Sequence, residues 1–175
     1  YAFVEPTLDM KQDSWLRAHV AMFEALGGSV PRIVPDNLRT GVITHPRDGE
    51  IVLNDAYREM AAHYSAAVLP GRVRHAKDKA SVENTVWHVA MRIIADLRDE
   101  QFASLPELKA AITTRVAAYN QEPFQKRPGS RASVFATEEQ PLLTGLPQVA
   151  YEISRWVYGR RVGRNGHVVW EKNFY

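Results

Sequence analysis

The sequence contains no cysteine, which excludes disulfide bonds and thiolate metal sites and fits a reducing cytoplasm. It also has no apolar run of membrane-spanning length, no recognisable signal peptide, no internal repeat and no low-complexity tract. Excess charge is nearly absent, because 22 basic and 20 acidic residues leave a formal net charge of +2. This balance does not by itself indicate a nucleic-acid partner, so the positions of the charges carry more information.

The composition is that of a globular protein, with 175 residues of which 45% are hydrophobic and 24% charged. This length is enough for one core and a small appendage. We expect a core domain over 1–121, a proline-containing linker over 122–150 and the start of a small C-terminal β-domain over 151–175. Because Tyr1 already lies in a predicted strand, we expect the chain to be an excerpt of a longer polypeptide.

The core domain alternates predicted strands with predicted helices. This order favours an α/β fold whose crossover connections make the sheet largely parallel. In the last segment, strands over 153–162 and 167–170 flank Asn165-Gly166, a strong hairpin signal. In chain order the other elements are a strand at 1–6, a helix at 9–26, a strand at 30–34, a hairpin-like excursion at 42–53, a helix at 55–65, a strand at 66–69, and helices at 78–100 and 104–120.

The helix predicted at 78–100 carries a carboxylate on its apolar side. Glu83 falls inside the apolar arc, where an unpaired charge is costly to bury. One interpretation is structural: Glu83 pairs with Lys79 and favours the positive end of the helix dipole. The other interpretations are a hydrogen-bond network and a bound metal. The arc itself is formed by Val82, Val86, Val89, Ile93 and Leu97, widened by Trp87, Ala90 and Ile94.

A second carboxylate is predicted to reach the same edge of the sheet. Asp36 follows the strand at 30–34, and Glu83 opens the helix that is reached from the strand at 66–69. Ligands of parallel sheets bind beyond the carboxyl ends of the strands. Paired carboxylates without cysteine suit Mg²⁺ or Mn²⁺, which can promote phosphodiester chemistry. In isolation, Asp36 can also be explained as the start of a turn.

Basic residues gather in two places. The first cluster precedes the Glu83 helix, and the second lies in the C-terminal segment. Each is either a solvated surface or a footprint for a phosphate backbone. The candidate DNA-binding residues are Arg72, Arg74, Lys77 and Lys79 in the first cluster, and Arg160, Arg161 and Arg164 in the second.

Four stretches of the chain together resemble a known family. They cover nearly its whole length, and the two acidic stretches are fairly specific in combination. The chain resembles the catalytic core of insertion-sequence transposases of the IstA type, in the DDE transposase and retroviral-integrase superfamily with its ribonuclease H-like fold. The stretches are 34–40 (VPDNLRT), 77–83 (KDKASVE), 120–131 (NQEPFQKRPGSR) and 166–175 (GHVVWEKNFY).

The resemblance implies specific roles for the two carboxylates. Asp36 would be the second acidic metal ligand and Glu83 the third, with Mg²⁺ or Mn²⁺ as the cofactor. The first aspartate would lie upstream, since Asp9 and Asp13 stand at a helix entrance rather than within a strand. This truncated ribonuclease H-like core, a mixed sheet flanked by helices, is therefore expected to be inactive alone.

The resemblance also implies the reaction and the partners of the intact enzyme. It would cleave the 3′ ends of a transposon and join them to target DNA, acting as a multimer on paired ends in the bacterial cytoplasm at the nucleoid. An AAA+ helper ATPase would select the target. Two alternatives remain: a DNA-binding or assembly protein of the same fold without chemistry, and a nuclease of ribonuclease H type. The linker and the trailing β-domain argue against the nuclease.

Overall fold

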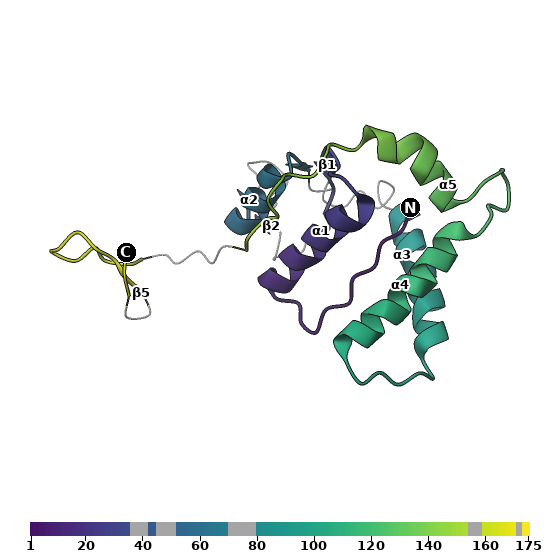
Figure 1. Cartoon of the computed structure of the whole chain (residues 1–175), viewed down its shortest axis with the longest axis horizontal. Helices are drawn as coiled ribbons and strands as arrows, with labels where there is room; N and C mark the ends of the chain where they lie inside the picture. Colours follow the sequence, from purple (N-terminus) through teal and green to yellow (C-terminus); the bar gives the residue numbers. More distant parts are fainter. Residues whose placement is uncertain (36–41, 45–51, 70–79, 154–158, 171–172) are drawn as a thin grey trace.

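A computed structural model gives the architecture of the chain (Figure 1). It describes residues 1–35, 42–44, 52–69, 80–153, 159–170 and 173–175, without the side chains of 42–44, 52, 80–83 and 85. The fold is a mixture of helices and short strands. In chain order the elements are α1 (Gln12–Leu26), β1 (Arg32–Ile33), β2 (Val42–Thr44), β3 (Val52–Leu53), α2 (Asp55–His63), β4 (Ala67–Val68), α3 (Ala80–Leu97), α4 (Leu105–Gln121), α5 (Arg131–Val134), a π-helix (Phe135–Glu139), a 3₁₀-helix (Gln140–Leu142), β5 (Val169–Trp170) and β6 (Asn173–Phe174).

Helix boundaries follow local capping chemistry, as the sequence predicts. The Asn54 side chain accepts a hydrogen bond from the Ala56 backbone N–H (3.0 Å) at the start of α2. The Ser104 hydroxyl accepts one from the Glu107 backbone N–H (3.4 Å) at the start of α4. Gly27 ends α1 with φ +72°, a left-handed conformation that glycine adopts without steric cost.

The strands form three two-stranded sheets within the described residues. β1 and β4 are parallel, with Arg32 opposite Ala67 and Ile33 opposite Val68. β2 and β3 are antiparallel and form the excursion expected between the first two crossovers. The predicted parallel pairing is therefore confirmed for β1 and β4. The larger mixed sheet of a ribonuclease H-like core stays a prediction.

One hydrophobic core lies between α1, α2 and the β1–β4 pair. Leu16, Phe23, Tyr57 and Met60 are fully buried there, and Phe23 stacks on Tyr64 with ring centroids 4.4 Å apart. Burial of each large apolar side chain stabilises the fold by about 1.5–3 kcal/mol. This core fixes the direction of the parallel strands.

A polar chain crosses the same core. The Tyr57 hydroxyl donates to His19 Nε2 (3.2 Å), and His19 Nδ1–H donates to the Trp15 carbonyl (2.9 Å), which is a self-consistent tautomer. Burial lowers the pKa of His19 and raises the pKa of Tyr57 to about 12. Both side chains are therefore held neutral at physiological pH.

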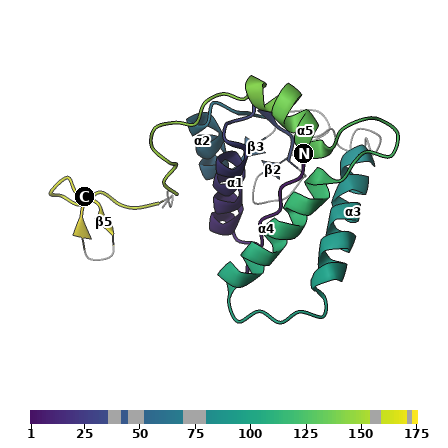
Figure 2. The same cartoon turned by 45° about the vertical axis from the view of Figure 1, so that its right-hand side comes forward.

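A second core lies between α3 and α4, which run side by side (Figure 2). The predicted face of α3 is only partly right. Val89 and Ile93 are buried against α4, but Val86, Trp87 and Ile94 are 60%, 58% and 66% exposed. α4 covers a single stripe of α3, so the flanks of the apolar arc remain open to solvent.

The strand predicted at 1–6 is wrong. Ala2 and Val4 pack against the α3–α4 core, but the segment joins no sheet within the part of the chain that the structure describes. The buried Asn120 amide takes the place of a neighbouring strand: its Oδ1 accepts from the Ala2 N–H (2.9 Å) and its Nδ2 donates to the Ala2 carbonyl (2.8 Å). A side chain thus satisfies the backbone groups that a sheet would pair.

Residues 122–150 carry α5 and the π- and 3₁₀-helices, where only one short helical stretch was expected. The segment also packs on the rest of the chain. Ser29 and Thr144 exchange two backbone hydrogen bonds (2.8 and 2.9 Å), and Tyr1 stacks on Phe135 with centroids 4.5 Å apart. The division into 1–121, 122–150 and 151–175 stays a prediction.

The C-terminal hairpin forms one turn later than predicted. β5 pairs with β6 across 171–172, whereas Asn165-Gly166 lies in a turn that Gly163 closes by accepting from the Gly166 N–H (3.0 Å). Of the strand predicted at 153–162, residues 159–162 are not a strand, and residues 154–158 lie outside the described residues. Among the described helices, none has the length and apolar composition of a membrane span.

Candidate acidic site and nucleic-acid interface

The parallel pair β1–β4 positions the candidate acidic site. Backbone hydrogen bonds from Ala67 N to Pro31 O (3.0 Å) and from Leu69 N to Ile33 O (2.8 Å) hold the two strands in register. Their carboxyl ends therefore lie at one edge, where parallel sheets commonly bind ligands. The chain leaves this edge toward Asp36 after β1 and toward α3 after β4.

The structure describes the two predicted metal ligands to different extents. Asp36 lies outside the described residues. Glu83 belongs to the first turn of α3, which begins at Ala80, but its side chain is not among those described. In the described part of the chain, no group of three acidic, histidine or cysteine residues could hold a metal ion. Asp36 and the Glu83 side chain lie outside this part of the chain, so the pair stays a prediction.

Asp9, which the sequence analysis set aside as a metal ligand, has a structural role. Its carboxylate accepts from the Ser14 hydroxyl (2.6 Å) and from the Lys11 N–H (3.0 Å), just before α1. The Ser14 hydrogen bond, followed by that of Lys11, lowers the pKa of Asp9. The Asp9 carboxylate therefore stabilises the start of α1.

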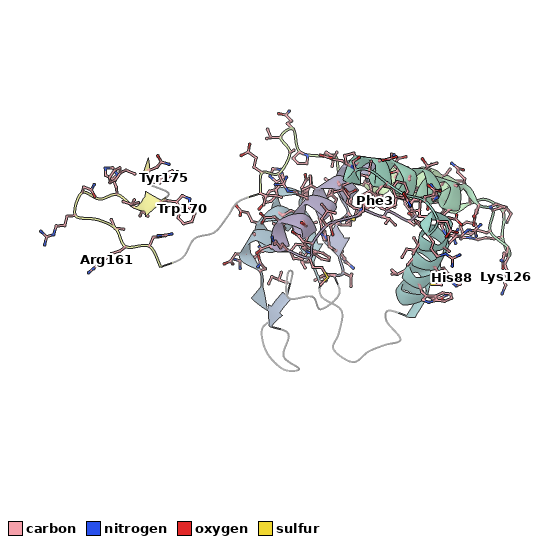
Figure 3. The ribbon with its side chains drawn as sticks, turned by 90° about the horizontal axis from the view of Figure 1, so that it is seen from below. Phe3, His88, Lys126, Arg161, Trp170 and Tyr175 are labelled. Carbon is pink, nitrogen blue, oxygen red and sulfur yellow. The ribbon has the colours of Figure 1, made fainter. Side chains whose placement is uncertain are left out.

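The structure likewise describes only some of the predicted DNA-binding residues. Arg72, Arg74, Lys77 and Lys79 lie outside the described residues. The remaining three are exposed in the C-terminal segment, where the Arg160 guanidinium stacks over the Trp170 ring at 4.6 Å. Figure 3 shows this segment at one end of the molecule and His88 with Lys126 at the other. The three C-terminal arginines are Arg160, Arg161 and Arg164.

A third group of cations, which the sequence pattern did not single out, lies on the loop that follows α4. Arg127 stacks on Phe124 at 4.1 Å, and Arg131 stacks on Tyr119 at 4.0 Å. The motif at 120–131 contributed to the family resemblance but was given no role. Its signal was the close spacing of aromatic and arginine residues, which is typical of stacked guanidinium groups.

The curated proteins that are similar to this chain are named as transposases. No protein-family model matches. The chain spans between 27% and 42% of the length of the curated relatives described next. Similarity therefore concerns a part of these proteins and covers most or all of this chain.

Three of these relatives come from different bacteria. A "Putative transposase for insertion sequence IS1162" of Pseudomonas fluorescens is 40% identical over 153 residues, which are 87% of this chain and 27% of the relative. "Putative transposase y4uI" of Sinorhizobium fredii is 33% identical over 99% of this chain and 34% of its own length. "Putative transposase Rv3428c" of Mycobacterium tuberculosis is 34% identical over 100% of this chain and 42% of its own length.

Proposed function

We propose that this chain is part of the catalytic core of an insertion-sequence transposase, which cleaves and joins DNA strands with divalent metal ions. The observation that carries the proposal is the similarity of 87% to 100% of the chain to proteins named as transposases. The ribonuclease H-like fold, the DDE type and the IstA type are parts of the proposal. They are supported by the acidic motifs around Asp36 and Glu83.

The donor set fits a hard cation. Asp36 and Glu83 supply carboxylate oxygens, the ligands that Mg²⁺ and Mn²⁺ prefer, and the chain has no cysteine to attract softer metals. These two residues would hold the metal together with a third carboxylate from outside this chain. A bound ion of this kind polarises phosphodiester oxygens and stabilises the charge that develops on them.

Helix α3 supports the role of Glu83 electrostatically. Glu83 lies in the first turn of α3, where the partial positive charge of the helix N-terminus favours an ionised carboxylate. An ionised carboxylate is the form that binds metal.

The partners of the whole protein belong to the same proposal. DNA is both the transposon end and the target, and the exposed Arg160, Arg161 and Arg164 are available to its phosphates. A multimer on paired ends, an AAA+ helper ATPase and a place at the bacterial nucleoid follow from the resemblance to IstA-type enzymes.

The proposal is tested by a strand-joining assay with the full-length product of the gene. The substrate is a DNA end with a free 3′-hydroxyl, taken from the DNA that flanks the coding sequence, with Mn²⁺ and a target plasmid. We expect Glu83→Gln and Asp36→Asn to abolish joining while leaving binding of the DNA end intact. Asp96→Asn is the matched control, because Asp96 is an exposed carboxylate on the same helix.

Two results would contradict the proposal. Normal joining by Glu83→Gln would remove its central ligand. Binding of the DNA end without joining by the wild-type protein, with the helper ATPase supplied, would favour a DNA-binding protein without chemistry.

A further inference from the structure

A groove runs between the solvent-facing side of α3 and the loop that follows α4. Its volume is about 790 Å³, and we call it the basic groove. Asn84, His88 and Arg92 of α3 line one wall, and Lys126, Arg127 and Arg131 line the other. Figure 3 shows His88 and Lys126 at the same end of the molecule. The basic groove thus joins two segments that lie far apart in the sequence.

The groove has an excess of positive charge. Among its described lining residues the one carboxylate, Glu122, forms an ion pair with Arg92 (2.6 Å), which fastens the end of α4 to α3. Lys126, Arg127 and Arg131 form no ion pair with any described residue. No described carboxylate therefore competes with an anionic ligand for these three cations, and Arg131 Nη1 also donates to the Tyr119 carbonyl (3.4 Å).

The two arginines of the loop are held in fixed planes. Arg127 lies 4.1 Å from the Phe124 ring centroid and Arg131 lies 4.0 Å from that of Tyr119. Stacking uses the flat face of a guanidinium group and leaves N–H donors at its edge, which match the oxygens of a phosphate. Side chains that are already ordered lose less conformational entropy when a ligand binds.

The loop backbone is also fixed before any ligand arrives. Phe124 N donates to Gly129 O (2.9 Å), and Pro123 and Ser130 form an antiparallel bridge. Gly129 has φ +86°, and a Cβ atom there would stand 2.8 Å from Ser133 Oγ. Any other residue at Gly129 would disturb this conformation. The loop therefore presents its cations on a rigid support.

The lining of the groove begins at the residue that follows Glu83, the proposed metal ligand. Asn84 follows Glu83 directly in α3, and His88 and Arg92 lie one and two further turns along the same side. From Asn84 to Arg92 the helix advances about 12 Å at 1.5 Å per residue. This distance corresponds to about three to four nucleotides of one duplex strand at 3.4 Å each.

We propose that the basic groove holds the phosphate backbone of the DNA strand that passes the Glu83 end of α3. This inference rests on the proposed function, because it takes DNA as the ligand. It adds a binding surface outside the acidic site and the C-terminal arginines. The groove contributes affinity and places the strand along α3, and the carboxylates carry the chemistry.

The test compares two double variants that remove equal charge. Lys126→Gln/Arg127→Gln removes two groove cations, and Arg17→Gln/Arg98→Gln removes two exposed arginines elsewhere. Binding of a fluorescent 30-base-pair duplex is followed by anisotropy in EDTA, between about 50 and 200 mM salt. EDTA separates this test from the chemistry, so a failure of strand joining does not affect it.

We expect the groove variant to bind roughly tenfold more weakly or worse. The slope of log K against log salt should become shallower by about 1.8, since each lost phosphate contact removes about 0.9. The control variant should keep the wild-type slope. Thermal unfolding of each variant establishes that the fold is intact.

A second measurement locates the DNA directly. A photo-crosslinking amino acid at the exposed position Gln125, in the groove wall, should capture the duplex, and one at Arg17 should not. Equal affinities and slopes for the two double variants would overturn the proposal. Absence of duplex binding, or stronger binding of poly-glutamate than of DNA at the groove, would overturn it as well.

Discussion

The two hydrophobic cores of this chain bury their apolar side chains to different extents. Around α1 and α2, Leu16, Phe23, Tyr57 and Met60 are completely buried, because helices and the β1–β4 pair surround them. Along α3, a single neighbouring helix covers one stripe, and Trp87 remains 58% exposed. An amphipathic pattern thus predicts which side of a helix is apolar. How much of that side is buried depends on how many other elements pack against it.

The largest effect should come from opening the first core. Phe23→Ala removes a fully buried ring that stacks on Tyr64, and we expect the free energy of unfolding to fall by about 3–5 kcal/mol. Ile93→Ala in the second core should cost only about 2 kcal/mol, near the lower end for such changes, because solvent already reaches the neighbouring side chains. Urea unfolding measures both. Equal losses would contradict the difference between the cores.

An intermediate effect is expected at the polar contact of the second core. Asn120→Ala leaves the Ala2 N–H and carbonyl without their partners, at a cost of about 1–3 kcal/mol. Hydrogen exchange should quicken at the amide of Ala2 and remain slow in α1. Gln121→Ala, at the exposed next position, is the matched control. Unchanged exchange at Ala2 would show that the amide does not hold this segment.

The smallest effect should come from the exposed flank of α3. Ile94→Ser changes a side chain that is 66% exposed, so the free energy of unfolding should change by no more than about 0.5 kcal/mol. The same substitution at its buried neighbour, Ile93→Ser, should cost several times more. A large loss in Ile94→Ser would mean that this flank is covered in solution.

The features that the sequence predicted well are local ones. Asn54 and Ser104 begin their helices because each cap needs only the next few residues. The strand predicted at 1–6 failed because a strand needs a partner that the local pattern does not specify, and here the Asn120 amide supplies the hydrogen bonds. Asn165-Gly166 does form a turn, but pairing between β5 and β6 decides where the hairpin lies.

In the candidate site, too, the sequence predicted local features better than contacts between distant segments. Alternation of strands and helices predicted parallel pairing, which β1 and β4 show, and a helix at 78–100 with Glu83 near its start; in the structure Glu83 lies in the first turn of α3. The basic groove was not predicted, because it exists only where α3 meets the loop carrying Lys126 and Arg127. Residue spacing along the chain does not reveal a contact between segments that are distant in sequence. The acidic pair itself stays a prediction that strand joining will test.

The contact between Ala2 and Asn120 has a consequence for folding during synthesis. These residues lie 118 positions apart, so the first segment has no amide partner until α4 has been made. At about 5–20 residues per second, a ribosome needs on the order of ten seconds to cover that interval. α1 and α2 can begin to pack much sooner, because their contacts are closer in sequence. Ala2 is therefore synthesised well before the amide that holds its backbone.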